Sequence, residues 1–223
     1  MMNDPKRDAL NMRAVLSLAL RGTGRVSPNP LVGCVIVGPG GLVGWGYHGE
    51  VGGPHAEAVA LDRAGERARG ATLYVNLEPC RHHGRTPPCA PRIIEAGIAR
   101  VVAGMADPDP RTGGGGLAMM REAGIEVTQG VLEDRCRQLN RGFLSRVERK
   151  RPWVTLKTAA TLDGNMAMPS GESRWITNPF SRLRAHLLRD ANDAVMVGIG
   201  TVSADDPLLT VRDVNGRDPV PVV

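Results

Sequence analysis

Three side chains that bind zinc readily occur in two short motifs of this chain. His55 lies in the tetrapeptide Pro-His-Ala-Glu, and Cys80 lies in Glu-Pro-Cys, nine residues before Cys89. One imidazole and two thiolates are ligand types that zinc prefers, and three protein ligands leave its fourth tetrahedral position for water. Zinc lowers the pKa of such a water to roughly 7. The motifs therefore predict a catalytic zinc site formed by His55, Cys80 and Cys89.

Glu57, two residues after His55, is the predicted proton carrier. A carboxylate beside the zinc water can take its proton and pass it to a ring nitrogen and a leaving amine. The order His-x-Glu and then Pro-Cys…Cys is that of zinc-dependent nucleobase deaminases, in which the glutamate is not a ligand. This chain departs from their spacing, because eight residues, RHHGRTPP, separate the two cysteines instead of two. The motifs predict a hydrolytic deaminase.

Two other interpretations remain open at this point. A structural zinc site wants a fourth protein ligand, which His82 or His83 of the insert can supply. Such a non-catalytic module would bind a partner or RNA and would tolerate the loss of Glu57. A deaminase acting on cytidine, guanine or tRNA adenosine would share the same motifs, and ammonia release from each substrate distinguishes these enzymes.

Strands and helices that alternate along the chain must position these side chains. Expected helices span residues 4–21, 55–64, 92–96, 117–123 and 131–147, and expected strands span 31–37, 42–47, 71–77, 101–105 and 125–128. The turn GPGG joins the first two strands into a hairpin. The alternation predicts a three-layer α/β sandwich, in which each zinc motif follows a strand and begins a helix.

A composition shift at the basic segment RVERKRP predicts a domain boundary near residue 150. The expected domains therefore span residues 1–150 and 151–223. The second contains an expected strand at 153–160, a helix at 178–189, a strand at 194–198 and another strand that begins at Val220. These elements predict a second α/β unit that is incomplete in this chain.

Composition narrows the function classes. The formal charge of +5 is spread along the chain and suits a phosphorylated small molecule, while two Phe and two Tyr offer few platforms for stacking nucleic-acid bases. No segment approaches the ~20 apolar residues of a membrane span. The N-terminal segment has the pattern of an amphipathic helix and not of a signal peptide, which predicts a cytoplasmic protein with reduced thiols. A homo-oligomer is compatible with the sequence.

Longer strings resemble the bifunctional deaminase/reductase family of riboflavin biosynthesis. They are SPNPLVGCVIV, VGWGYH, GPHAEAVAL, LEPCRHHGRTPPC and LNRGFL. The resemblance implies a cytidine-deaminase-like fold and deamination of 2,5-diamino-6-ribosylamino-4(3H)-pyrimidinone 5′-phosphate to 5-amino-6-(5-phosphoribosylamino)uracil. It also implies substrate contacts at Asn29, His48, His82, Arg85 and Thr86.

The strings LKTAATLDGNMAMPSGESRWIT and GIGTVSADDPLLTVR resemble the start of the family's reductase domain, which is similar to dihydrofolate reductase and uses NADPH. The resemblance implies substrate-side roles for Lys157, Ser173, Arg189, Leu209 and Arg212. It implies NADP-side roles for Ala159, Trp175, Thr201 and Asp205. Because the chain ends at Val223, before the family's later Gly-rich segment, we expect the chain alone not to turn over NADPH.

Overall fold

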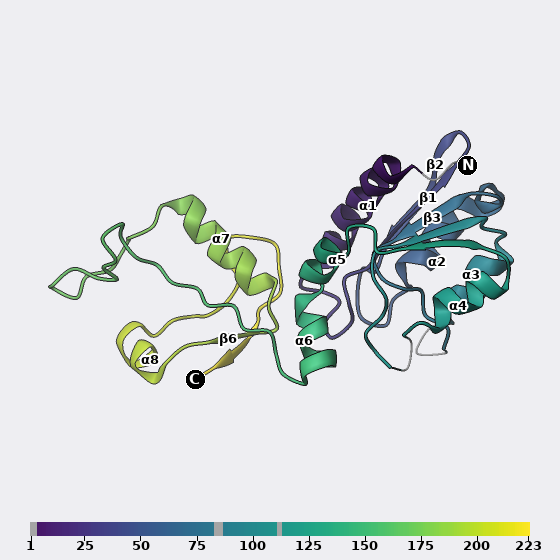
Figure 1. The fold of residues 1–223 in the computed structure, drawn as a ribbon. Helices are drawn as coiled ribbons and strands as arrows, with labels where there is room; N and C mark the ends of the chain where they lie inside the picture. The colour runs from purple at the N-terminus through teal and green to yellow at the C-terminus, as the bar shows by residue number, and fades with distance from the viewer. Residues whose placement is uncertain (1–3, 83–86, 111–112) are drawn as a thin grey trace. The chain divides into compact units, whose positions relative to one another are not determined.

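The computed structural model describes residues 4–82, 87–110 and 113–223, which form two compact units (Figure 1). The first unit extends to Trp153, and the second begins at Val154. Each unit is described by itself.

A five-stranded mixed sheet forms the centre of the first unit. Its strands are β1 (Gly33–Gly38), β2 (Gly41–Tyr47), β3 (Thr72–Val75), β4 (Arg100–Ala103) and β5 (Glu126–Gln129). They lie in the order β2-β1-β3-β4-β5. The hairpin pair β1–β2 and the pair β1–β3 are antiparallel, whereas β3–β4 and β4–β5 are parallel. The expected hairpin is therefore confirmed, and parallel pairing follows wherever a helix connects two strands.

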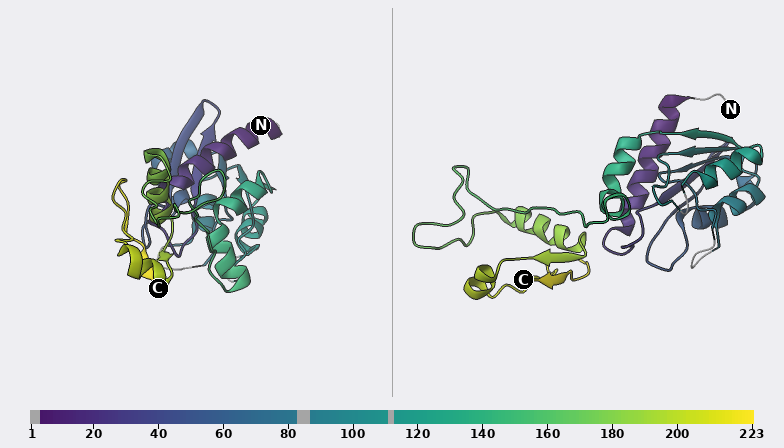
Figure 2. Two further views of the ribbon diagram at one scale, coloured as in Figure 1. Left: turned by 90° about the vertical axis from the view of Figure 1, so that its left-hand side faces the viewer. Right: turned by 60° about the horizontal axis from the view of Figure 1, so that its bottom comes forward.

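Helices cover both faces of this sheet. They are α1 (Pro5–Ala19), α2 (Ala56–Ala64), α3 (Cys89–Glu95), α4 (Gly115–Glu122), α5 (Glu133–Leu139) and α6 (Arg141–Arg149), with short 3-10 turns at Leu20–Gly22 and Gly65–Ala68. Helices α1 and α5 lie on one face, and α2, α3 and α4 lie on the other (Figures 1 and 2). The fold is thus the expected α/β sandwich of three layers.

A close approach between β2 and α2 places the first zinc motif over the sheet. A Cβ atom added to Gly46 would lie 2.4 Å from the carbonyl oxygen of Ala56. Only glycine allows the start of α2 to pack this closely on the strand. His55, which precedes Ala56, is therefore held at a defined height above the sheet.

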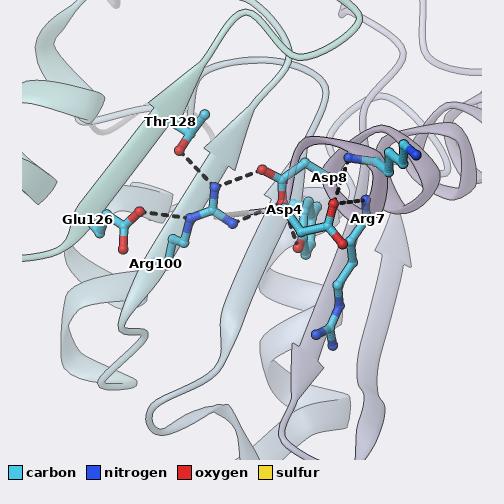
Figure 3. A network of polar contacts seen from close by, with 8 residues as sticks. Asp4, Arg7, Asp8, Arg100, Glu126 and Thr128 are labelled. Carbon is cyan, nitrogen blue, oxygen red and sulfur yellow. Dashed lines mark hydrogen bonds and ion pairs between the residues drawn. The ribbon is translucent and has the colours of Figure 1, made fainter. Parts of the chain in front are cut away.

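A buried ion pair fastens α1 to the opposite face. The guanidinium of Arg100 on β4 donates to both carboxylate oxygens of Asp8 at 2.9 and 2.7 Å (Figure 3). Arg100 also donates to Glu126 at 3.1 Å and to Thr128 at 2.9 Å, and the Tyr74 hydroxyl donates to Asp8 at 3.0 Å. These partners satisfy both buried charges, which is the condition for a stable buried pair.

The structure corrects two expected helices of the first unit. Helix α3 begins at Cys89 and not at residue 92, because Pro91 is tolerated in the first turn of a helix. The expected helix 131–147 is two helices, α5 and α6, separated at Asn140. The Asn140 backbone has φ −97° and ψ 19°. Its side-chain oxygen accepts a hydrogen bond from the backbone N–H of Leu31, which lies just before β1 and 109 residues away in the sequence. This tertiary contact interrupts the helix.

The second unit contains α7 (Pro179–Asp190), β6 (Ala194–Met196), α8 (Ile199–Asp205) and β7 (Val220–Val222), with β6 and β7 paired in parallel. The expected strand at 153–160 is wrong, because these described residues have no pairing partner and Val154 and Leu156 are 79% and 86% exposed. Helix α8 was not expected, since its sequence contains Gly200 and β-branched residues that disfavour helix.

No helix in the described ranges has both the length and the apolar character needed to cross a membrane.

Candidate zinc and substrate site

The three predicted metal ligands lie together at one end of the sheet. His55 is the N-cap residue of α2, Cys80 lies in the loop after β3, and Cys89 is the first residue of α3. The His55 Nδ1 atom lies 3.5 Å from Cys80 Sγ and 3.4 Å from Cys89 Sγ. All three ligand atoms lie within 4.8 Å of one another.

These separations fit a tetrahedral zinc ion. With Zn–S near 2.3 Å and Zn–N near 2.0 Å, tetrahedral ligands are separated by roughly 3.6 Å. The observed N···S distances of 3.4 and 3.5 Å are close to that value. Among the described residues, the group of potential metal ligands contains His55, Cys80 and Cys89 and does not include His82. The donor set therefore suits zinc with one position left open.

Local hydrogen bonds hold the two cysteines in register. The Cys89 N–H donates to Cys80 Sγ at 3.4 Å, and the Ala90 N–H donates to the Cys80 carbonyl at 3.0 Å. The first amides of α3 are thus satisfied by Cys80. Hydrogen bonds from Cys89 and His55 hold the pKa of the Cys80 thiol well below its usual range. Cys80 is therefore prepared to bind metal as a thiolate.

Glu57 lies in the first turn of α2 beside the metal ligands. Its side chain is buried, with 4% exposed. Burial raises the pKa of Glu57 to about 7, although the positive charge of His55 opposes this shift. A carboxyl group with such a pKa can both accept and donate a proton near neutral pH.

A cavity of about 500 Å³ opens onto these residues. Its lining contains Asn29, His48, His55, Glu57, Cys80 and His82 among the residues that the sequence predicted. Arg85 and Thr86 lie outside the described residues. The structure thus brings together every predicted residue of the first unit that it describes.

Asn29 and His48 form a pair with defined hydrogen-bond roles. His48 Nδ1 lies 3.0 Å from the Pro54 carbonyl oxygen, which can only accept, so Nδ1 carries the proton. His48 Nε2 then accepts from the Asn29 side-chain nitrogen at 3.1 Å. Burial lowers the pKa of His48, which favours this neutral form. The Asn29 oxygen takes no part in the contact with His48.

The cavity also contains residues that the sequence reasoning missed. Asp107 and Asp109 follow β4 and line the cavity, as do Phe143 and Arg146 of α6. Burial raises the pKa of Asp107 to about 6. The position of the two aspartates just after a strand could have predicted this, because ligands bind at the carboxyl ends of parallel strands in open α/β sheets. Nothing in the local sequence of α6 indicates that it reaches the cavity.

The predicted reductase residues of the second unit are spread over its length. Lys157 and Ala159 lie in an irregular segment, Ser173 and Trp175 lie in an exposed loop, and Thr201 and Asp205 lie on α8. Three others come together near the C-terminal end of α7. Arg189 donates to the Thr210 carbonyl at 3.1 Å. In the sequence, Thr210 follows the buried Leu209 and precedes Arg212 by two residues. Burial lowers the pKa of Arg189, and the positive charge of Arg212 lowers it further.

Two family models match the chain. Residues 5–105 match the cytidine and deoxycytidylate deaminase zinc-binding region. Residues 152–223 match the RibD C-terminal domain. The first match includes His55, Glu57, Cys80 and Cys89, and the second includes the whole of the second unit.

Individual proteins match over nearly the whole chain. The riboflavin biosynthesis protein RibD of Escherichia coli is 53% identical over 206 residues, which are 92% of this chain and 56% of that protein. The structure of a diaminohydroxyphosphoribosylaminopyrimidine deaminase/5-amino-6-(5-phosphoribosylamino)uracil reductase from Thermotoga maritima has a TM-score of 0.92 at 47% identity, covering 97% of this chain and 62% of that chain. This chain thus spans less than two thirds of the length of either protein.

A third structure corresponds mainly to the first unit. The Aspergillus oryzae Rib2 deaminase, a C-terminal deletion mutant in complex with DARIPP, is 25% identical with a TM-score of 0.53. The match covers 66% of this chain and 95% of that one.

Proposed function

Because this chain belongs to the RibD family of riboflavin biosynthesis proteins, we propose that its first unit is a zinc-dependent pyrimidine deaminase. The proposed substrate is 2,5-diamino-6-ribosylamino-4(3H)-pyrimidinone 5′-phosphate. Water replaces the C2 amino group, which leaves as ammonia, and the product is 5-amino-6-(5-phosphoribosylamino)uracil.

The observation that carries this proposal is the position of Glu57. A buried carboxyl group lies beside three side chains that suit zinc, and Glu57, His55 and Cys80 line one cavity. A structural zinc site needs neither an open ligand position nor a proton carrier next to it. The arrangement supports hydrolytic chemistry on a small molecule.

His55, Cys80 and Cys89 would hold the zinc, which supplies an acidified water at neutral pH when it is bound. Glu57 takes a proton from the attacking water and passes it to the ring nitrogen and then to the leaving amine. Burial of Glu57 keeps bulk water from competing for that proton. The same carboxyl group therefore serves both halves of the reaction.

Asn29 and His48, which both line the cavity, would orient the pyrimidine or its sugar. Because the Asn29 nitrogen donates to His48, the Asn29 carbonyl oxygen is the atom that can accept from a substrate N–H group. His82 lines the cavity and would contact the substrate. Arg85 and Thr86 would contact its phosphate, a role that rests on the resemblance of the HHGRTPP segment.

The second unit is proposed to belong to a reductase domain that uses NADPH. The pairing of Arg189 with the Thr210 carbonyl, near Arg212, supports a substrate-side role for the two guanidinium groups, since guanidinium binds phosphate well. Substrate-side roles for Lys157, Ser173 and Leu209 rest on resemblance. So do the NADP-side roles of Ala159, Trp175, Thr201 and Asp205.

The test is ammonia release by the zinc-loaded protein from the pyrimidinone phosphate, with cytidine and guanine as competing candidates. We expect turnover of the pyrimidinone phosphate alone. Glu57→Ala should keep zinc and lose about 10²- to 10⁴-fold in activity, the usual contribution of general acid–base catalysis. Glu66→Ala, which removes an exposed carboxylate of the 3-10 turn after α2, is the matched control and should retain wild-type activity.

Either of two results would contradict the proposal. One is near-normal ammonia release by Glu57→Ala, because the buried carboxyl group would then have no part in proton transfer. The other is faster release from cytidine or guanine than from the pyrimidinone phosphate, which would move the protein to a different substrate class.

A further inference from the structure

We propose that Glu78 is a positioning residue for the substrate cavity, acting through the segment that carries Asp107 and Asp109. Glu78 precedes Pro79 and Cys80, so it is rigidly linked to a metal ligand. No chemical role in proton transfer is needed for it. Its link to substrate recognition rests on the proposed function, whereas its structural link to the segment does not.

The Glu78 carboxylate accepts hydrogen bonds from four backbone N–H groups of the segment between β4 and α4 and of the first residues of α4. Oε1 accepts from Gly116 at 2.9 Å and from Leu117 at 3.1 Å, at the start of α4. Oε2 accepts from Gly114 at 2.8 Å and from Asp107 at 3.2 Å. The Glu78 side chain is buried, with 3% exposed, so these four amides take the place of solvating water around its carboxylate. Only a carboxylate offers two oxygens with enough lone pairs for all four donors.

The same segment is packed against the backbone next to Cys80. A Cβ atom added to Gly116 would lie 1.9 Å from the Pro79 carbonyl oxygen. The start of α4 therefore approaches the Pro79 backbone too closely for any residue with a Cβ atom at position 116. Two independent features, a charged hydrogen-bond acceptor and a glycine contact, hold the two segments in one register.

This register fixes the aspartates of the cavity. Asp107 donates its backbone N–H to Glu78, and its side chain accepts from the Asp109 N–H at 2.9 Å. The Gly113 N–H in turn donates to the Asp109 carbonyl at 2.8 Å. Asp107 and Asp109 both line the cavity. Glu78 thus sets the position of these two carboxylates relative to the metal ligands.

The glutamate of the Glu-Pro-Cys motif therefore has a purpose different from that of the cysteine. Cys80 would bind the metal, whereas Glu78 aligns the segment of Asp107 and Asp109 with it. Loss of this alignment should weaken substrate binding more than the chemical step, because the metal ligands and Glu57 remain in place. Weaker binding with unchanged chemistry appears as a higher KM at similar kcat.

The test compares Glu78→Gln with Asp8→Asn in the full chain loaded with zinc. Glutamine keeps the shape of the side chain, but its NH₂ group would face the N–H groups of Asp107 and Gly114. Asp8 is an equally buried carboxylate, with 4% exposed, and lies in the ion pair with Arg100 away from the cavity. It controls for a general loss of stability.

For Glu78→Gln we expect one zinc per chain, a KM raised about tenfold or more, and kcat within roughly threefold of wild type. Amide hydrogen exchange at Gly114, Gly116 and Leu117 should be at least about tenfold faster, because each amide loses a charged acceptor. Asp8→Asn should leave KM and these amides unchanged. If Glu78→Gln does not fold, Gly116→Ala should raise KM in the same way with the carboxylate intact.

Unchanged exchange at these amides, or an unchanged KM in both Glu78→Gln and Gly116→Ala, would overturn the inference. Loss of zinc from Glu78→Gln would also overturn it, because Glu78 would then act on the metal ligands and not on the segment of Asp107 and Asp109. If the wild-type protein releases no ammonia from the pyrimidinone phosphate, the proposed function fails, and the exchange comparison still decides whether Glu78 holds the segment.

Discussion

The side-chain amide of Asn140 makes two hydrogen bonds with the backbone of Leu31. Its oxygen accepts from the Leu31 N–H at 2.7 Å, and its nitrogen donates to the Leu31 carbonyl at 3.0 Å. The side-chain nitrogen of Asn76, the residue after β3, donates to the same carbonyl at 2.8 Å. Leu31 lies two residues after Asn29, which lines the cavity. The junction between α5 and α6 therefore holds the residues that precede β1 at the edge of the cavity.

Replacement of Asn140 by aspartate tests this contact with almost no change in shape. The new carboxylate still accepts from the Leu31 N–H, but its second oxygen would face the Leu31 carbonyl. We expect a loss of about 1–3 kcal/mol in the free energy of unfolding, the usual cost of an unsatisfied buried polar contact. Urea unfolding measures it. Asn192→Asp, at a surface side chain that bonds to the Leu188 carbonyl, should cost clearly less, and equal costs would contradict the assignment.

The buried pair of Asp8 and Arg100 should behave as a structural ion pair. Asp8→Ala removes the bidentate partner of a guanidinium whose side chain is only 7% exposed, and we expect a loss of about 3–5 kcal/mol. The double variant Asp8→Leu with Arg100→Met should lose less than Asp8→Ala alone, because it leaves no uncompensated charge. Denaturant unfolding of both proteins decides the order. A double variant less stable than Asp8→Ala would show that the pair contributes through packing that Leu and Met cannot replace.

Metal content should separate the site cysteines from the other buried cysteines. Cys89→Ser exchanges a soft thiolate for a hydroxyl, so we expect the variant to purify with little zinc and a lower midpoint of thermal unfolding. Cys136→Ser is the matched control, since Cys136 is a fully buried residue of α5 and does not belong to the group of potential metal ligands found among the described residues. Elemental analysis after dialysis measures both. Equal zinc content in the two variants would exclude Cys89 as a ligand.

Protonation of His186 should loosen the second unit. His186 Nδ1 accepts from the Arg212 backbone N–H at 3.2 Å, and Nε2 lies 3.2 Å from Asp213. Burial lowers the pKa of His186 from its usual value near 6.5; Asp213 opposes this shift, and the charges of Arg189 and Arg212 add to it. The neutral form is therefore the stabilised one. Its contribution is fully present above pH 6.5 and is lost as the pH falls through the lowered folded-state pKa.

An NMR titration of the His186 ring should give a pKa below 6.5, and exchange of the Arg212 amide should accelerate as the pH falls through it, beyond the intrinsic change in exchange rate. His186→Gln should remove that acceleration. A His186 pKa above 6.5 would show that Asp213 outweighs burial and the two arginines.

Local sequence determined much of this protein. The alternation of strands and helices predicted the three-layer sandwich, because hydrophobic periodicity and turn residues act over a few neighbouring positions. The zinc group was predictable for a different reason: imidazole and thiolate side chains beside prolines have few other uses in a polar loop. The resemblance then supplied the proposed substrate contacts at Asn29 and His48, which no spacing rule would have selected.

Tertiary structure decided what depends on distant partners. The break at Asn140 follows from a bond to Leu31, 109 residues away, and the absence of a strand at 153–160 follows from the lack of a pairing partner among the described residues. Asp107, Asp109 and Arg146 reach the cavity only because the sheet and α6 bring them there. Glu78 is the clearest case. Its sequence neighbours point to the metal, but its carboxylate serves four amides that lie 29 to 39 residues further along the chain, and only the folded backbone places them within its reach.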